Sequence, residues 1–192
     1  MSKAAAAFED SFPKFRRFDP GESQTSQIKN SATRAILQSI AEQYPNVAEA
    51  IKDILSSKKL LIAKCRDTQV QLLVVDNEIL FFQHRDGAFF PTLRLLHRYP
   101  TIMPRMQVDK GAIPFVLGGS NIMCPGFTSA GGSLPFPIDA EQPVAIFAEG
   151  KQHPLAVGMT KMSTDDIVRV NKGVAVETYH YLMDGLWQSP TM

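Results

Sequence analysis

The stretch of sequence that decides the fold of the second half reads Val-Asp-Lys-Gly-Ala-Ile over residues 108–113 and Val-Leu-Gly-Gly-Ser-Asn-Ile-Met-Cys-Pro-Gly over residues 116–126. Short apolar runs separated by glycine and proline are typical of a compact β-barrel with many turns. Because glycine has no Cβ atom, it also allows a phosphate chain or a base to approach the backbone closely. Two interpretations of these glycines stay open: they form tight barrel turns, or they expose backbone N–H groups to a ligand.

The residues around this stretch predict further short elements. We expect a helix that Ser163 caps and that ends near Val170, because Asp165 and Asp166 complement a helix N-terminus. Residues 149–152 predict a hairpin turn. The other expected elements are a strand at residue 108, a short helix over residues 111–117, a loop over residues 125–136, and strands over residues 122–123, 143–148, 155–159 and 174–181.

The first half has a different pattern, with helices followed by a small antiparallel sheet. Apolar residues recur at helical spacing over residues 31–44, where Ser31 is the expected cap and Pro45 ends the helix. Phe12, Phe15 and Phe18 recur every third residue and are expected to dock on the domain. Further predicted elements are a helix over residues 46–55 capped by Asn46, strands over residues 60–63, 70–75 and 78–83, and a short helix between Pro91 and Pro100.

A chain of 192 residues suits two small domains. Pro100 and Pro104 bracket a connector over residues 101–105, after which glycine and proline become frequent. The sequence therefore predicts an α+β protein in four parts: a flexible N-terminal extension (residues 1–11), an α/β domain (residues 12–100), a β-pseudo-barrel (residues 101–187) and a tail (residues 188–192).

Composition sets limits on the class of protein. The chain is 44% hydrophobic and 20% charged, which is ordinary for a globular protein, and its formal net charge is only +1. Any nucleic-acid surface must therefore come from local clusters of lysine and arginine. Two widely spaced cysteines, with neither a signal segment nor a membrane-spanning run, predict a cytoplasmic protein with free thiols.

No pattern for catalysis stands out. Cys124 lies among apolar residues, is expected to be buried, and has no recognised base partner that would form a thiolate. Cys65 lies between Lys64 and Arg66, whose charges lower the pKa of a nearby thiol, but adjacent residues of a strand point to opposite faces, which favours incidental reactivity over function. The four histidines do not fall at metal-ligand spacing, so we expect neither a metal nor a cofactor. The sequence has no phosphate-binding loop, nucleophile elbow or dinucleotide fingerprint.

Residues 108–126, with Glu-Gly-Lys at 149–151 and Val-Gly at 157–158, resemble the signature of the PUA domain. In that pseudo-barrel a short helix and its glycine-rich loop lie against RNA. The resemblance extends to the whole malignant T-cell-amplified sequence family over about residues 12–187. It rests on Glu-Ile-Leu-Phe-Phe at 78–82, Phe-Pro-Thr-Leu-Arg-Leu-Leu-His at 90–97, Asn-Lys-Gly at 171–173 and Asp-Gly-Leu-Trp at 184–187. By this likeness residues 12–100 form a pre-PUA domain and residues 101–187 a PUA domain.

The resemblance implies a function that composition and spacing alone do not give. Members of this family are non-catalytic RNA-binding translation factors. By this likeness the chain pairs with a density-regulated-protein-like subunit, binds the small ribosomal subunit, and promotes reinitiation, non-standard initiation and tRNA release or recycling. Ribosomal RNA and tRNA are the RNA partners it implies, with no membrane involved. Residues 1–11 extend beyond the usual start of the family, so the likeness gives them no role.

Two sets of candidate RNA-binding residues follow. Lysines beside the glycine-rich loops can supply charge to phosphates, while the loop backbone approaches the RNA. The first set is Lys110, Gly111, Ala112, Gly118, Gly119, Asn121, Pro125, Gly126, Lys151 and Lys161. A second set, a candidate ribosomal-RNA face on the first domain, is Lys58, Lys59, Lys64, Arg66, Arg85, Arg94 and Arg98. The alternative for the second set is an ordinary solvated surface.

Two other functions fit parts of the sequence. The chain could be an RNA-modification accessory protein that uses the PUA domain to position RNA, which predicts turnover on RNA. It could instead be an interaction module without RNA binding, and partner binding would then be indifferent to loss of Lys110 and Lys151.

Overall fold

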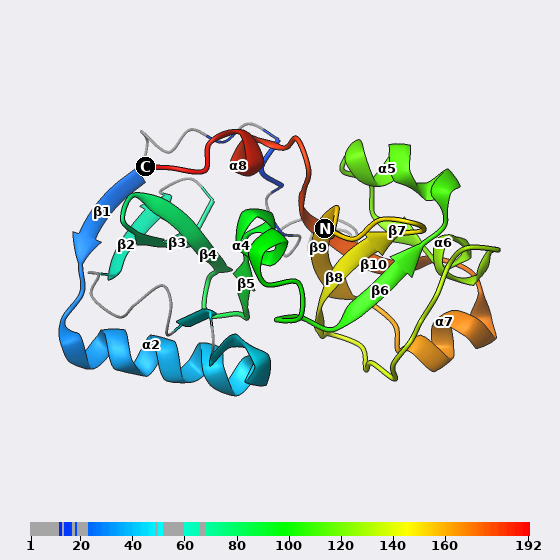
Figure 1. Ribbon diagram of the computed structural model, residues 1–192, viewed down its shortest axis with the longest axis horizontal. Helices are drawn as coiled ribbons and strands as arrows, with labels where there is room; N and C mark the ends of the chain where they lie inside the picture. Colours follow the sequence, from blue (N-terminus) through cyan, green and yellow to red (C-terminus); the bar gives the residue numbers. More distant parts are fainter. Residues whose placement is uncertain are drawn as a thin grey trace, which may run out of the picture.

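The computed structural model describes residues 12, 14–16, 18, 23–48, 50–51, 60–65 and 68–192. Within these ranges the strands form two five-stranded sheets, one toward each end of an elongated molecule (Figure 1). The predicted α+β class is confirmed. Each sheet comes from one half of the chain, and the segment that follows the last strand returns to the first half.

The first sheet is antiparallel, and its strands follow one another in chain order. Its three central strands confirm the prediction. Two edge strands were not predicted, because β1 is polar and largely exposed and β5 has only three residues. The strands are β1 (Ser23–Gln27), β2 (Leu60–Cys65), β3 (Val70–Val75), β4 (Glu78–His84) and β5 (Phe89–Pro91).

The helices of the first half differ from the prediction at their starts. Helix α2 (Asn30–Gln43) begins one residue before Ser31, and the residue in the N-cap position is Lys29, whose backbone is extended and whose side chain makes no capping bond. The predicted Ser31 cap is therefore wrong. After Tyr44 the chain forms the 3₁₀ helix η2 (Pro45–Val47), as expected for a proline that ends α2.

Two other predictions for helices have mixed outcomes. Asn46 lies inside η2 and donates from its side-chain amide to the Thr101 carbonyl at 3.2 Å, so it does not cap a helix. Residues 48, 50 and 51 of the predicted second helix are helical, and its residues 49 and 52–55 lie outside the described residues. Helix α4 (Leu93–Arg98) confirms the helix between two prolines, and Thr92 Oγ1 accepts from the Leu95 N–H at its start.

The second sheet has the order β6-β8-β9-β10-β7 and curls into a half-barrel. The pair β6–β8 is parallel and the other pairs are antiparallel. The strands, all of which overlap predicted ones, are β6 (Arg105–Val108), β7 (Ile122–Met123), β8 (Pro143–Ala148), β9 (Ala156–Thr160) and β10 (Val174–Tyr181).

Short helices join these strands. The predicted helix after β6 is present as η3 (Lys110–Ala112) followed by α5 (Ile113–Leu117). Helix α7 (Thr164–Val170) has Ser163 as its N-cap, as predicted. The prediction of a loop from residue 125 is wrong at its start, because Pro125 opens α6 (Pro125–Thr128). Helix α8 (Gly185–Gln188), which Asp184 caps, was not predicted.

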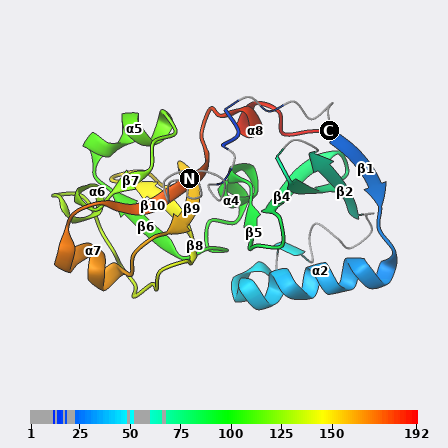
Figure 2. The ribbon, with the colours of Figure 1, turned by 180° about the vertical axis from the view of Figure 1, so that it is seen from behind.

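One of the two hydrophobic clusters of the described residues spans both halves, and the other lies within the second half. Phe147 and Val157 of the second sheet and Leu186 of α8 belong to the same buried cluster as the residues of the first sheet. Phe12 and Phe15 are also buried there, which confirms that these aromatic residues dock on the protein. Seen from behind, β10 leads into α8, which lies beside α4 at the junction of the halves (Figure 2).

The helices in the described ranges are short. Among them, none is both long enough and apolar enough to cross a lipid bilayer.

Candidate nucleic-acid interface

A groove of about 450 Å³ lies where the two glycine-rich motifs meet. The backbone N–H of Asp109 donates to the Gly126 carbonyl at 3.0 Å, so the first and second motifs lie side by side. Five predicted RNA-binding residues border the groove: Gly111, Ala112, Asn121, Pro125 and Gly126. Its other lining residues are Asp109, Phe115, Val116, Ser120, Ile122, Met123 and Ser129.

Asp109 shapes the entrance to the short helix. Its Oδ1 atom accepts from the backbone N–H of Ala112 at 2.8 Å, which caps η3. A Cβ atom added at Gly111 would lie 3.1 Å from that oxygen, so any side chain at this position would crowd the capping turn. The Asp-Lys-Gly-Ala sequence thus places Lys110 on the outside of a tight, capped turn.

The glycines do not have equal structural importance. Gly119 has a φ of +75°, and a Cβ atom there would lie 2.7 Å from the Tyr181 ring. Gly118 has an ordinary helical φ of −80°. At Gly126 an added Cβ would make only normal van der Waals contacts, the nearest at 3.5 Å. Backbone geometry therefore requires glycine at position 119, and Gly126 is the least constrained of the four.

The groove has exposed apolar side chains on its border. Phe115 is 67% exposed and Met123 is 49% exposed, and both line the groove. An exposed aromatic ring beside a cationic surface can stack on an unpaired base. Sequence reasoning missed both residues, because apolar side chains in short runs were assigned to the core. In α5 only Val116 is buried, so its neighbour Phe115 faces solvent.

Two predicted lysines lie at the same end of the sheet as the groove. Lys110 follows β6 and Lys151 follows β8, and these strands are parallel with Val108 opposite Ala148. Both side chains are exposed. Lys110 Nζ lies 4.0 Å from Glu149 Oε1, a contact that is weak and easily exchanged for a phosphate. Lys110 and Lys151 therefore place exposed positive charge at this end of the sheet, although neither lines the groove itself.

Lys161 lies elsewhere. Its Nζ atom is 2.8 Å from Glu141 Oε1, before the start of β8, where Pro143 pairs with Met159. The length of β8, six residues, separates this pair from the end that carries Lys151. That length is about 20 Å of strand. The structure thus separates Lys161 from Lys151, and Lys161 is not one of the residues that line the groove.

The second predicted set is only partly gathered in space. Lys64 and Arg85 both line a pocket of about 550 Å³ at the edge of the first sheet, where Arg85 Nε donates to Gln69 Oε1 at 2.9 Å. Arg98 pairs instead with Glu78 at 2.8 Å. Lys58, Lys59 and Arg66 lie outside the described residues.

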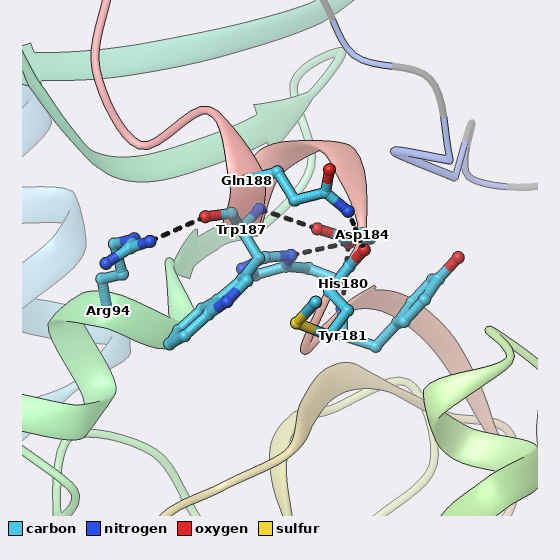
Figure 3. Close-up of polar contacts among 7 residues, drawn as sticks. Arg94, His180, Tyr181, Asp184, Trp187 and Gln188 are labelled. Atoms are coloured by element: carbon cyan, nitrogen blue, oxygen red, sulfur yellow. Dashed lines mark hydrogen bonds and ion pairs between the residues drawn. The ribbon is translucent and has the colours of Figure 1, made fainter.

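Arg94 belongs to the junction between the two halves (Figure 3). Its Nη2 atom donates to the Trp187 carbonyl at 2.9 Å, and its guanidinium lies 4.4 Å from the centre of the Trp187 ring. Asp184 accepts from the backbone N–H of Trp187 at 2.9 Å and of Tyr181 at 3.0 Å, and His180 Nδ1 lies 2.7 Å from the same carboxylate. These bonds are structural and leave Arg94 little freedom to reach a phosphate.

The residues weighed for catalysis have structural surroundings. Cys124 is buried as predicted, and burial raises the pKa of its thiol. Burial also raises the pKa of the Cys65 thiol, so neither cysteine is poised as a thiolate. The backbone N–H of Asp166 donates to Ser163 Oγ at 3.2 Å, which confirms the capping role of this segment. The described part of the chain has no group of three or more potential metal ligands.

Comparison with known proteins gives matches along most of the chain. Residues 19–100 match the model of the Pre-PUA-like domain, and residues 104–182 match that of the PUA domain. Malignant T-cell-amplified sequence 1-B of Xenopus laevis is 49% identical over 180 residues, covering 92% of this chain and 98% of the relative. Malignant T-cell-amplified sequence 2 of Homo sapiens is 48% identical over the same shares of both chains.

Solved structures show the same fold at lower identity. Hypothetical protein PH0734.1 from Pyrococcus horikoshii has a TM-score of 0.70 and 22% identity, covering 87% of this chain and 99% of the other. A conserved PUA domain protein from Thermoplasma acidophilum has a TM-score of 0.64 and 20% identity, with the same coverage of both chains.

Proposed function

The chain belongs to the malignant T-cell-amplified sequence family, and from this premise we propose that it is a non-catalytic RNA-binding translation factor of the small ribosomal subunit. The observation that carries the proposal is the groove in the PUA domain. Exposed Phe115 and Met123 border it, and Lys110 and Lys151 follow the strands that end beside it. A site for unpaired RNA needs two parts: cations that hold the phosphate backbone, and an apolar surface on which bases stack.

Family membership supports the more specific part of the proposal. We infer that the chain pairs with a density-regulated-protein-like subunit in the cytoplasm, and that the pair promotes reinitiation, non-standard initiation and tRNA release or recycling. In this role the protein acts by holding its ligands in place. The PUA groove binds structured ribosomal RNA or the end of a tRNA, while other surfaces bind the partner. Lys64 and Arg85 are the described residues of the first domain that remain grouped for a second RNA contact.

The test is co-sedimentation with purified small ribosomal subunits over a salt series, with and without the density-regulated partner. We compare wild type with the Lys110→Glu, Lys151→Glu double variant. Because two phosphate contacts are lost, we expect at least about tenfold weaker binding, with the slope of log affinity against log salt reduced by about 1.4 to 1.8.

The matched control is the Lys29→Glu, Arg34→Glu double variant, which makes the same charge change on exposed side chains at and near the start of α2. We expect it to bind like wild type. Equal losses in the two double variants would remove the groove from the proposal. Failure of well-folded wild type to co-sediment, even with its partner, would remove the ribosomal role, and turnover of RNA by the purified protein would favour a modification enzyme.

A further inference from the structure

The segment that precedes the first sheet docks against both halves of the molecule. The rings of Phe12 and Tyr179 are stacked with centroids 4.1 Å apart, and Phe15 packs edge-on against Phe82 of the first sheet at 5.1 Å. The Phe15 carbonyl accepts from the backbone N–H of Gly185 at 2.6 Å. Position 14 therefore lies between two anchored residues, and its backbone has little freedom to move.

From this position Lys14 reaches the loop between α5 and β7. Its Nζ atom donates to the Gly119 carbonyl at 2.7 Å and to Asn121 Oδ1 at 3.1 Å. These partners are more than one hundred residues away along the chain and belong to the second glycine-rich motif. Asn121 also lines the groove. One side chain thus links the docked segment to the border of the proposed RNA site.

Hydrogen bonds from β10 also fix the loop between α5 and β7. Asn121 Oδ1 also accepts from the backbone N–H of Thr178 at 3.3 Å, and Thr178 Oγ1 donates to the Ser120 carbonyl at 2.8 Å. Three consecutive residues, 119 to 121, are therefore held by β10 on one side and by Lys14 on the other. Gly119, the first of these residues, has a positive φ, and its backbone lies close to the Tyr181 ring.

The surroundings of the Lys14 ammonium group suit a structural hydrogen-bond donor better than a cation that is free to bind phosphate. The side chain is half-buried, and burial is the largest cause that lowers its pKa, followed by the charge of Arg16, while Glu177 acts in the opposite direction. Two of its three N–H groups already have acceptors within the protein. A hydrogen bond from a charged donor at a partly desolvated site is stronger than one at the open surface.

We propose that Lys14 is a positioning residue that fixes the conformation of residues 119–121 and thereby couples docking of the N-terminal segment to the affinity of the groove for RNA. The proposal rests on the proposed function for its RNA readout. Lys14 touches the loop from the side of the first domain, so it acts through Asn121 and Gly119 without itself contacting RNA.

The test uses the full chain with Lys14→Met, which keeps an unbranched side chain but removes its donors, and Lys14→Arg, which keeps a charged donor. Lys29→Met is the matched control, because Lys29 is exposed and lies in the first domain. Amide hydrogen exchange of residues 118–121 and 178 reports on the loop. Binding of purified small ribosomal subunits over a salt series reports on the groove, and thermal unfolding reports on the whole fold.

We expect Lys14→Met to speed exchange of the loop amides and to weaken RNA binding by about threefold to tenfold, with an unchanged salt slope. Lys14→Arg should recover most of both, and Lys29→Met should match wild type. Unchanged exchange rates of the loop amides in Lys14→Met would show that Lys14 does not hold the loop. A reduced salt slope would mean that Lys14 contacts phosphate directly, and tighter binding would mean that it blocks the groove; either result overturns the proposal.

The two proposals fail in different ways. If wild type does not bind small ribosomal subunits, the proposed function is wrong, while the exchange rates of the loop amides still decide whether Lys14 holds the loop. If wild type binds and Lys14→Met matches it in both exchange and affinity, the proposed function stands and the positioning role of Lys14 is wrong.

Discussion

Gly119 shows how one residue constrains the candidate site. Two separate costs oppose any side chain at this position: its φ of +75° disfavours residues with a Cβ atom, and the space that a Cβ would fill is taken by the Tyr181 ring. The first cost is a backbone property, whereas the second depends on the neighbour. The two can be separated, because Gly173 has a φ of +90° but nothing within 4 Å of its would-be Cβ.

We therefore expect Gly119→Ala to lower the free energy of unfolding by about 2 to 4 kcal/mol and Gly173→Ala by only about 1 kcal/mol. Denaturant unfolding followed by circular dichroism measures both. The comparison decides between the two costs. Equal losses would show that the Tyr181 ring yields without penalty and that backbone conformation alone selects glycine.

Helix α5 is the element that makes the groove apolar. With five residues it has too little surface to bury on all sides, and Val116 is the only one of them that is fully buried. Phe115 therefore stands exposed beside the groove, where it contributes little to the core. An exposed ring of this kind is suited to stacking on a base, which is worth about 1 to 3 kcal/mol per base.

From this geometry we expect Phe115→Ala to weaken binding to small ribosomal subunits by at least about fivefold. Because the ring is largely exposed, the free energy of unfolding should change by less than about 0.5 kcal/mol. Val168→Ala on α7 is the control, since Val168 is exposed to a similar degree, at 63%, but does not line the groove. A large loss of stability with unchanged binding would instead assign Phe115 to packing.

The sequence predicted elements whose apolar pattern matches their burial. β3 and β4 were found because each contains a run of four apolar residues, and α7 was found from its cap. β1 was missed because Ser23–Gln27 is polar and pairs only at the edge of the sheet. An apolar pattern cannot reveal a strand that is held by hydrogen bonds to its neighbouring strand and that buries few side chains.

The candidate site was predictable only in part, for a related reason. Residues predicted together because they are close in the chain, such as Gly111 and Ala112, do line one groove, and Lys110 directly precedes them; their contact with RNA stays a prediction. Lys161 was grouped with them, although β8 and β9 carry it to the other end of the sheet. The contacts of Lys14 and Arg94 join residues about a hundred positions apart, and the residues around each of them carry no local signal for such pairs.

At the scale of the whole molecule, the pre-PUA and PUA halves are joined by a hydrophobic cluster that continues from the first sheet into the second, while the PUA half also has a cluster of its own. Phe147, Val157 and Leu186 pack in the same cluster as the first sheet, and the buried Asp184 carboxylate organises the turn that leads into α8. An interface built from core residues resists separation of the two halves more than a polar interface would.

This continuity predicts a single cooperative unfolding transition. The one tryptophan of the chain, Trp187, lies at the junction, so its fluorescence reports on the contact between the halves. Circular dichroism reports on both sheets together. We expect the two probes to give the same midpoint in denaturant. A fluorescence midpoint at clearly lower denaturant would show that the junction opens before the domains unfold.

The residues after α8 return to the first sheet and hydrogen-bond there. The backbone N–H of Ile79 donates to the Pro190 carbonyl at 2.9 Å, and that of Met192 donates to the Asn77 carbonyl at 3.0 Å. A ribosome makes these residues only after the whole second sheet, so during synthesis the first domain has to wait for them. Its sheet can form early, but the start of β4, which β5 does not cover, lacks these partners until the second sheet has been synthesised. For a protein proposed to act on ribosomes, closure of its own first domain thus depends on a segment that leaves the ribosome only after the second domain.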